Sequence, residues 1–198
     1  MINSQKSKVK NQKIISMYQI IIFGPPGVGK GTQAELIAKK LDLLHISTGA
    51  ILRQAFSEGT ELGIKAKEIM DKGNLVPDDV MNGIVKETLM KVKGGGFILD
   101  GYPRTLEQAK ALTEIFKELN FNNIKVINLT ASEDEIIERL LKRGRSDDTK
   151  DTITNRLKVY FDSTAPVKEY YDRLGYVKET DGSGKIESIY DNIIKDIK

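Results

Sequence analysis

Apolar residues along the chain gather in short runs that alternate with longer stretches of helical spacing. The first run, residues 18–23, has the length of one strand, and similar runs stand at Phe97–Leu99, Ile124–Leu129 and Tyr176–Lys178. Largely unbroken apolar runs are typical of parallel strands that are buried on both faces. The pattern therefore predicts strands at these positions in a parallel sheet.

The stretches between these runs predict helices. One helix, over residues 148–174, must be kinked or interrupted at Pro166. Between residues 47 and 93 the chain is mainly helical, so a helical lobe interrupts the alternation. Strands that alternate with helices predict an α/β fold with right-handed crossovers. The other helices are expected at residues 32–41, 105–119, 132–142 (which opens with a Ser-x-x-Glu capping box) and 186–198.

The composition is that of one globular domain with room for small inserted lobes. Of 198 residues, 39% are hydrophobic and 30% are charged, and no stretch is apolar enough to cross a membrane. The chain has no cysteine, which excludes disulfides and thiolate metal sites and fits a reducing, cytoplasmic location. We therefore expect neither membrane nor nucleic-acid partners, because the body of the chain is also nearly neutral.

The basic charge lies at the N-terminus. Residues 1–17 carry four lysines and no acid, so of the net charge of +3 the remainder holds 3 − 4 = −1. Residues 1–16 have no apolar core and are not a signal peptide. We interpret them as a disordered tail; a translation start upstream of Met17 is the alternative, and the absence of arginine disfavours an organelle-targeting segment.

A glycine-rich loop, Gly24–Thr32, follows the first strand and opens a helix, which is the context of a phosphate-binding loop. Glycines allow backbone N–H groups to converge on phosphate oxygens, and Lys30 adds a charge that follows the transferring group. Gly31 stands where a Mg²⁺-binding Ser or Thr would follow the lysine, and Thr32 comes one residue later. We therefore expect Mg²⁺ to be held mainly by ATP oxygens and water.

Arginine is rare in this chain and is concentrated near acids. Only seven of the 31 basic residues are arginine, and Arg139, Arg143 and Arg145 stand just before two aspartates, with Arg156 three helical turns further on. The guanidinium group binds phosphate bidentately, so this cluster indicates phosphoryl chemistry; a solvated, salt-bridged face is the alternative. Asp100 ends a predicted strand, where it can hold Mg²⁺ through water. The only histidine, His45, is interpreted as structural.

From residue 18 to residue 198 these motifs, in this order, resemble the adenylate kinase family. The phosphate loop, Ser47-Thr48-Gly49 with Arg53, Asp100–Arg104 with Gln108, and the arginine cluster carry the resemblance. It implies a three-layer P-loop fold with a five-stranded parallel sheet, a helical monophosphate-binding lobe at about 47–76 and a short lid at about 140–152. It also implies reversible Mg²⁺-dependent transfer of the γ-phosphoryl of ATP to AMP, giving two ADP, by a monomer.

The resemblance implies a set of site residues. Asp100 would position Mg²⁺ through water, Arg139 would lie against the ATP base, and Thr48 with Gln108 would read adenine. The catalytic group comprises Lys30, Arg104, Arg143, Arg145 and Arg156. The ATP-binding group comprises Gly27, Val28, Gly29, Lys30, Gly31, Thr32, Arg139, Arg143 and Gly184. The AMP-binding group comprises Thr48, Gly49, Arg53, Val76, Gly101, Arg104, Gln108, Arg145 and Arg156.

Two departures from the family pattern and two alternatives remain. The family usually has an acid where Ala50 stands, so we expect reduced turnover. The lid is too short to hold an inserted small domain and the chain has no cysteine, so we expect no zinc. A UMP/CMP kinase shares the loop and lid, but usually has alanine and asparagine in place of Thr48 and Gln108. A nucleotide-binding homologue without catalysis is the other alternative, for which Ala50 is the only indication.

Overall fold

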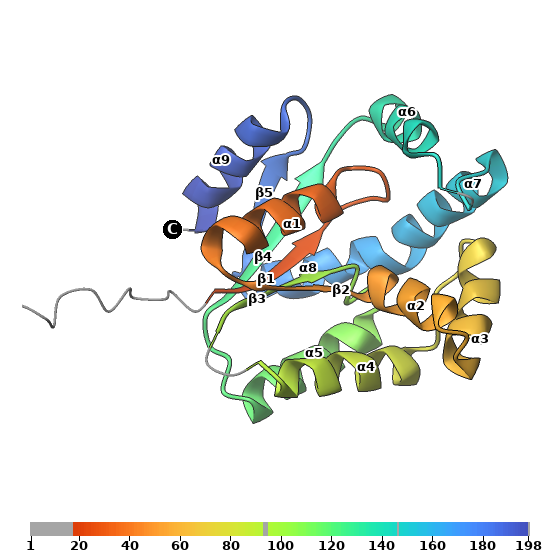
Figure 1. The fold of residues 1–198 in the computed structure, drawn as a ribbon. Helices are drawn as coiled ribbons and strands as arrows, with labels where there is room; N and C mark the ends of the chain where they lie inside the picture. Colours follow the sequence, from red (N-terminus) through yellow and green to blue (C-terminus); the bar gives the residue numbers. More distant parts are fainter. Residues whose placement is uncertain (1–17, 93–94, 146, 198) are drawn as a thin grey trace, which may run out of the picture.

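The computed structural model describes residues 18–92, 95–145 and 147–197, so the expected tail at 1–16 lies outside the described residues. Five parallel strands form one sheet in the order β2-β3-β1-β4-β5 (Figure 1). The predicted parallel α/β fold is confirmed. The sequence pattern delimited four of these strands and left out the short edge strand β2. The strands are β1 (Gln19–Phe23), β2 (Leu44–Ser47), β3 (Phe97–Asp100), β4 (Ile124–Thr130) and β5 (Val177–Asp181).

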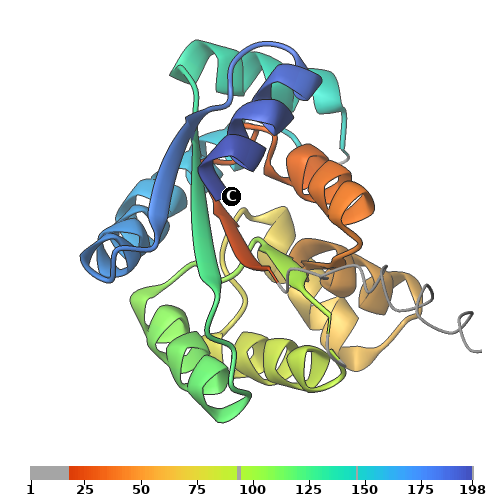
Figure 2. The same ribbon diagram turned by 90° about the vertical axis from the view of Figure 1, so that its left-hand side faces the viewer.

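Helices cover both faces of the sheet (Figure 2). On one face, Ile20 and Ile22 of β1 pack with α1 (Lys30–Leu41) and α9 (Ile186–Ile197). On the other face, Ile21 and Phe23 pack in a larger core, to which three helices beside the sheet and two helices described below contribute. Because both faces are covered, β1 is apolar at successive positions rather than at alternate ones. The three helices are α4 (Asp78–Met90), α5 (Leu106–Glu118) and α8 (Ala165–Arg173).

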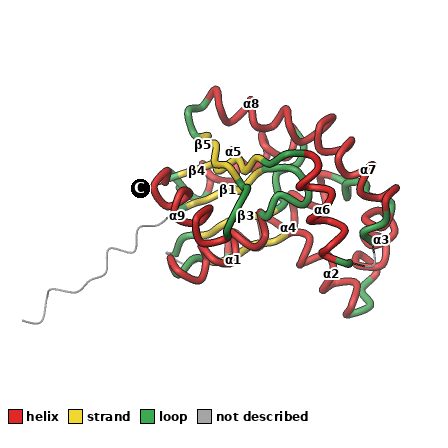
Figure 3. Tube along the Cα trace, turned by 90° about the horizontal axis from the view of Figure 1, so that it is seen from above, coloured by secondary structure: helices red, strands yellow, loops and turns green. Residues whose placement is uncertain are grey.

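Four further helices gather at one end of the molecule, as the view along the vertical axis shows (Figure 3). Helices α2 (Thr48–Ser57) and α3 (Glu61–Asp71) pack against each other. Helices α6 (Glu133–Arg143) and α7 (Lys150–Val159) share a small separate core. The two pairs flank the loops that follow β1 and β3, so side chains from both pairs can reach the same space.

The long helix predicted over residues 148–174 is interrupted, as Pro166 required. Helix α7 passes through a π-helical turn, Tyr160–Thr164, into α8, and Pro166 lies in the first turn of α8. A proline is tolerated there because N–H groups of a first turn need no partner in the same helix. The turn also directs the Thr164 hydroxyl to the carbonyl of Arg104, to which it donates at 2.9 Å.

Candidate active site

The loop between β1 and α1 has a backbone that favours glycine at three positions, Gly24, Gly27 and Gly29. Gly24 has a φ of 136°, and a Cβ there would lie 2.5 Å from the carbonyl oxygen of Leu129. Gly29, with a φ of 103°, caps the N-terminus of α1 in the left-handed region. These conformations turn the chain from the buried strand into the helix, whose free N–H groups and dipole favour an anion at this end.

Lys30 points back into this loop. Its ammonium donates to the carbonyl oxygens of Gly24 at 2.7 Å and Pro25 at 2.8 Å. Burial lowers the pKa of Lys30 to about 8; Asp100 opposes this shift, and Arg104 and Arg143 add to it. Because burial removes water from around the Lys30 ammonium, the negative charge of a bound phosphate would stabilise its charged form.

Asp100 ends β3 beside this loop. Its backbone is in register with Ile22 of β1, and a Cβ added at Gly31 would lie 3.4 Å from its Oδ2 atom. Burial by itself would raise the pKa of Asp100, but the nearby His45 ring and the charges of Lys30 and Arg104 hold it below its usual value. Asp100 is therefore an ionised carboxylate among cations, as a site for water-mediated Mg²⁺ needs.

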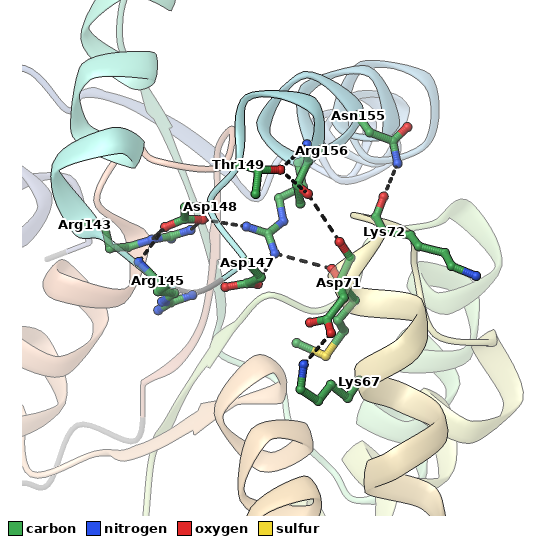
Figure 4. A network of polar contacts seen from close by, with 12 residues as sticks. Lys67, Asp71, Lys72, Arg143, Arg145, Asp147, Asp148, Thr149, Asn155 and Arg156 are labelled. Atoms are coloured by element: carbon green, nitrogen blue, oxygen red, sulfur yellow. Dashed lines mark hydrogen bonds and ion pairs between the residues drawn. The ribbon is translucent and has the colours of Figure 1, made fainter.

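The arginines near α6 and α7 converge on one aspartate (Figure 4). Asp148, whose side chain is 1% exposed, accepts two bonds from Arg143, at 2.8 and 2.6 Å, and one from Arg156 at 2.7 Å. Arg156 also pairs with Asp147. Burial favours the protonated form of Asp148, but Arg143 and Arg156 hold its pKa below the usual value. Two carboxylates thus keep adjacent guanidinium groups in place despite their mutual repulsion.

Arg139 is held by hydrogen bonds to three different residues. One nitrogen donates to the carbonyls of Val28 at 3.0 Å and Gly182 at 2.9 Å, and another pairs with Glu135. Arg139 also lines the cleft, so these bonds hold its planar guanidinium group in place there.

A smaller pocket adjoins the cleft on the side of α2 and α5. Thr48 donates to the carbonyl of Gly101 at 2.9 Å, and Gln108 accepts from the backbone N–H of Arg104 at 2.7 Å. Val76 and Gly101 complete much of its wall. Arg104 lines both pockets, and its Nε donates to the carbonyl of Gly101. The smaller pocket thus places two buried polar side chains among apolar ones.

The residues expected to form a site come together. A cleft of about 980 Å³ is lined by the phosphate loop, Asp100 and six of the seven arginines. Thr48, Val76 and Gln108 line the smaller pocket instead. His45, interpreted from sequence as structural, also lines the cleft, with Nε2 3.7 Å from Asp100. His45 lies on β2, the strand beside β3, so a prediction of β2 from the sequence would have placed this histidine near the cleft. The arginines in the cleft are Arg53, Arg104, Arg139, Arg143, Arg145 and Arg156.

Helix α7 also bridges to the end of α3 (Figure 4). Thr152 donates to the carbonyl of Asp71 at 3.3 Å, and Asn155 donates to the carbonyl of Lys72 at 2.7 Å. Arg156 reaches the carbonyl of Met70 at 3.4 Å. Carbonyl oxygens at the C-terminus of a helix lack partners within it, so α7 caps α3 and ties the two helix pairs together.

Comparison with known proteins gives a consistent result. The family model described as adenylate kinase matches residues 22–176. A protein of Leptospira biflexa serovar Patoc named adenylate kinase is 48% identical over 186 residues, covering 91% of this chain and 100% of the relative. The adenylate kinase of Mycobacterium marinum is 46% identical, covering 87% and 94%. Adenylate kinase 1 of Synechocystis sp. is 47% identical, covering 90% and 96%.

Proposed function

The chain belongs to the adenylate kinase family, and on that premise we propose how its cleft transfers the γ-phosphoryl of ATP to AMP, giving two ADP. The chain is a phosphotransferase with adenylate kinase function. One observation carries the proposed roles: Lys30, Asp100 and six arginines from separate parts of the sequence line a single cleft. Such a concentration of cations matches the charge of two nucleotides and a transferring phosphoryl group.

ATP occupies the side formed by the phosphate loop. The loop N–H groups and Lys30 hold its β- and γ-phosphates, and Lys30 exchanges the carbonyls of Gly24 and Pro25 for phosphate oxygens. Arg139 stacks on the base, near the loop that contains Gly184. Thr32 and the N-terminus of α1 complete the anion site.

Mg²⁺ would be bound together with ATP. The single ionised carboxylate of Asp100, close to the phosphate loop, fits an ion that keeps most of its water and is bound chiefly by phosphate oxygens. When bound, the ion would neutralise part of the charge that develops on the phosphates, and Asp100 would hold it through water.

AMP occupies the other side of the cleft. Arg53 and Arg104 hold its phosphate, and its base enters the smaller pocket against Val76, Gly101, Thr48 and Gln108. That pocket has a volume of about 40 Å³, space for only a few water molecules, so entry of the base requires the lobe at about 47–76 to shift.

The transfer step needs positioning and charge rather than a general base. Arg143, Arg145 and Arg156 stabilise the equatorial oxygens of the transferring phosphoryl group. The γ-phosphate of ATP and the phosphate of AMP are held in line during this step. Arg143 and Arg156 leave Asp148 for the phosphoryl group, a substitution of one anion for another. Closure of the lid at about 140–152 keeps water from accepting the phosphoryl group in place of AMP.

The test is ADP production from ATP and Mg²⁺ with AMP, UMP, CMP or no acceptor. We expect fast turnover with AMP alone. Preference for UMP or CMP would contradict the roles of Thr48 and Gln108, and ATP loss without acceptor would contradict transfer to a nucleotide. We also propose that the enzyme acts as a cytoplasmic monomer; in the described part of the chain no helix is long and apolar enough to span a membrane.

A further inference from the structure

Asp78, the first residue of α4, is the hydrogen-bond partner of a residue in the smaller pocket. Its Oδ1 accepts from the Nε2 of Gln108 at 2.8 Å, and its Oδ2 accepts from the hydroxyl of Thr105 at 2.8 Å. Asp78 does not line the pocket itself, whereas Gln108 does. The carboxylate therefore acts on whatever binds in the pocket only through the Gln108 amide.

The Gln108 amide is held from both ends in one orientation. A carboxylate can only accept, so Asp78 selects the amide nitrogen; a backbone N–H can only donate, so Arg104 selects the amide oxygen, at 2.7 Å. Turning the amide over would place two acceptors together at one end and two donors at the other. Since Gln108 is 2% exposed, water cannot readily relieve that mismatch.

The fixed amide retains one N–H and one lone pair of its oxygen for a ligand. A 6-amino purine offers an amino donor beside a ring-nitrogen acceptor, which complements this pair. A 6-oxo purine of nearly the same shape offers an acceptor beside a ring N–H, which is the reverse. A buried polar group left unpaired is what makes such a site reject the wrong base.

We propose that Asp78 is a specificity-determining positioning residue for the acceptor base. By fixing the Gln108 amide, it makes the smaller pocket favour a 6-amino purine over a 6-oxo purine. The proposal rests on the proposed function, because it takes this pocket as the site of the acceptor base. Asp78 touches no substrate, so its effect passes through Gln108.

The neighbouring Asp79 provides a matched control. Both acids lie in the first turn of α4, where each interacts favourably with the helix dipole, but Asp79 is exposed. Replacing either residue by alanine removes one negative charge from the same helix end. Only the change at Asp78 removes the acceptor of the Gln108 amide nitrogen.

The experiment compares kcat/KM for AMP and for IMP, with Mg²⁺-ATP as donor, in the wild type, Asp78→Ala and Asp79→Ala. We expect the AMP-to-IMP ratio to fall about tenfold in Asp78→Ala, the size of one charge-assisted hydrogen bond, and to stay unchanged in Asp79→Ala. KM for ATP should stay unchanged in both. The ratio does not depend on the fraction of folded enzyme, so partial unfolding cannot imitate the result.

Two further variants separate positioning from general damage. Asp78→Asn keeps an oxygen that can accept from Gln108 and should retain the wild-type ratio. Adding Asp78→Ala to Gln108→Ala should not lower the ratio further, because the amide through which Asp78 acts is gone.

The proposal is overturned if Asp78→Ala keeps the wild-type ratio, if Asp79→Ala or Asp78→Asn loses as much, or if the double variant loses more than Gln108→Ala. A wild type that does not use AMP would refute the proposed function instead, and would show it before any variant is measured.

Discussion

At the residue scale, the cleft depends on charged side chains that are held by temporary partners. Lys30 donates to carbonyls of its own loop, and Arg143 and Arg156 share Asp148. In the absence of nucleotide these partners accept hydrogen bonds from the cations. When nucleotide binds, a phosphate oxygen replaces each protein acceptor, so the free-energy cost of the exchange is modest. The free enzyme can thus concentrate positive charge where a phosphate will bind.

The first prediction concerns the pH dependence of ATP capture. In the free enzyme the pKa of Lys30 is about 8, so Lys30 is a cation below that pH and becomes neutral above it. The value of kcat/KM for ATP should therefore be constant at lower pH and fall above about pH 8. Bound phosphate stabilises the cation, so kcat at saturating ATP should stay level to higher pH. Steady-state profiles for ATP at saturating AMP give both curves.

Lys30→Arg serves as the control for this profile. Arginine stays protonated throughout the range, so the residual activity should lose the decline near pH 8. A decline that persists in the variant would mean that another group titrates.

The second prediction concerns Ala50, which is exposed and lines the cleft. The family usually has an acid here, and Asp100, the last residue of β3, is a carboxylate that lines the same cleft. We expect Ala50→Asp to raise kcat by a few-fold with little change in KM for either nucleotide. Ala50→Asn introduces a side chain of the size of aspartate without its charge and should give no gain in kcat. An equal kcat in Ala50→Asp and the wild type would contradict this prediction.

At the element scale, short-range side-chain bonds decide where helices begin. Thr60, Thr105, Ser132 and Thr149 each accept from the backbone N–H three residues later, and so cap α3, α5, α6 and α7. In the capping box predicted at Ser132, the serine hydroxyl accepts from the Glu135 N–H at 3.4 Å. The Glu135 carboxylate instead pairs with Arg139 and accepts from the Ser183 hydroxyl. A residue that could have completed a local cap supports the site instead.

The third prediction tests the cap of α7. Thr149→Ala removes the acceptor of the Thr152 N–H at the start of the helix that carries Arg156. We expect a loss of about 1 kcal/mol in the free energy of unfolding, and a fall of about 2–4 °C in Tm. Thr154→Ala is the matched control, because Thr154 is exposed and bonds only within its own helix. Calorimetry that shows equal losses in both variants would contradict the capping role.

At the scale of the whole molecule, α7 holds the end of α3, and the residues that follow α3 reach the smaller pocket. Asn155 donates to the carbonyl of Lys72 and, at 3.0 Å, to the side chain of Asn74. Asn74 and Val76 both line that pocket. The lid side and the acceptor side are therefore connected through backbone carbonyls rather than through a nucleotide.

The fourth prediction follows from this bridge. Asn155→Ala should raise KM for AMP about fivefold, as expected for the loss of one net hydrogen bond that orders the pocket, and leave KM for ATP unchanged. Steady-state kinetics with each nucleotide varied in turn supplies the measurement. Asp151→Ala, at an exposed position of the same helix, should change neither constant. Equal rises in both KM values would indicate general loosening rather than a specific bridge.

The sequence by itself determined the features that depend on neighbours along the chain. The apolar runs, the phosphate loop between strand and helix, the interruption at Pro166 and the helix starts all follow from interactions over a few residues. Family motifs extended this to the residues of the cleft. Only the tertiary structure showed β2 at the edge of the sheet, since only Ile46 of its four residues is buried, which hides the strand pattern.

The tertiary structure alone also decided which polar groups hold one another. Asp78 lies 30 residues before Gln108, and Thr152 lies 81 residues after Asp71. His45 meets Asp100 because β2 is the parallel neighbour of β3. Such pairings arise from the packing of whole elements, which brings distant residues to between 2.8 and 3.7 Å of one another without leaving any local periodicity. The sequence names the chemical groups, and the packing of sheet and helices fixes how they are oriented.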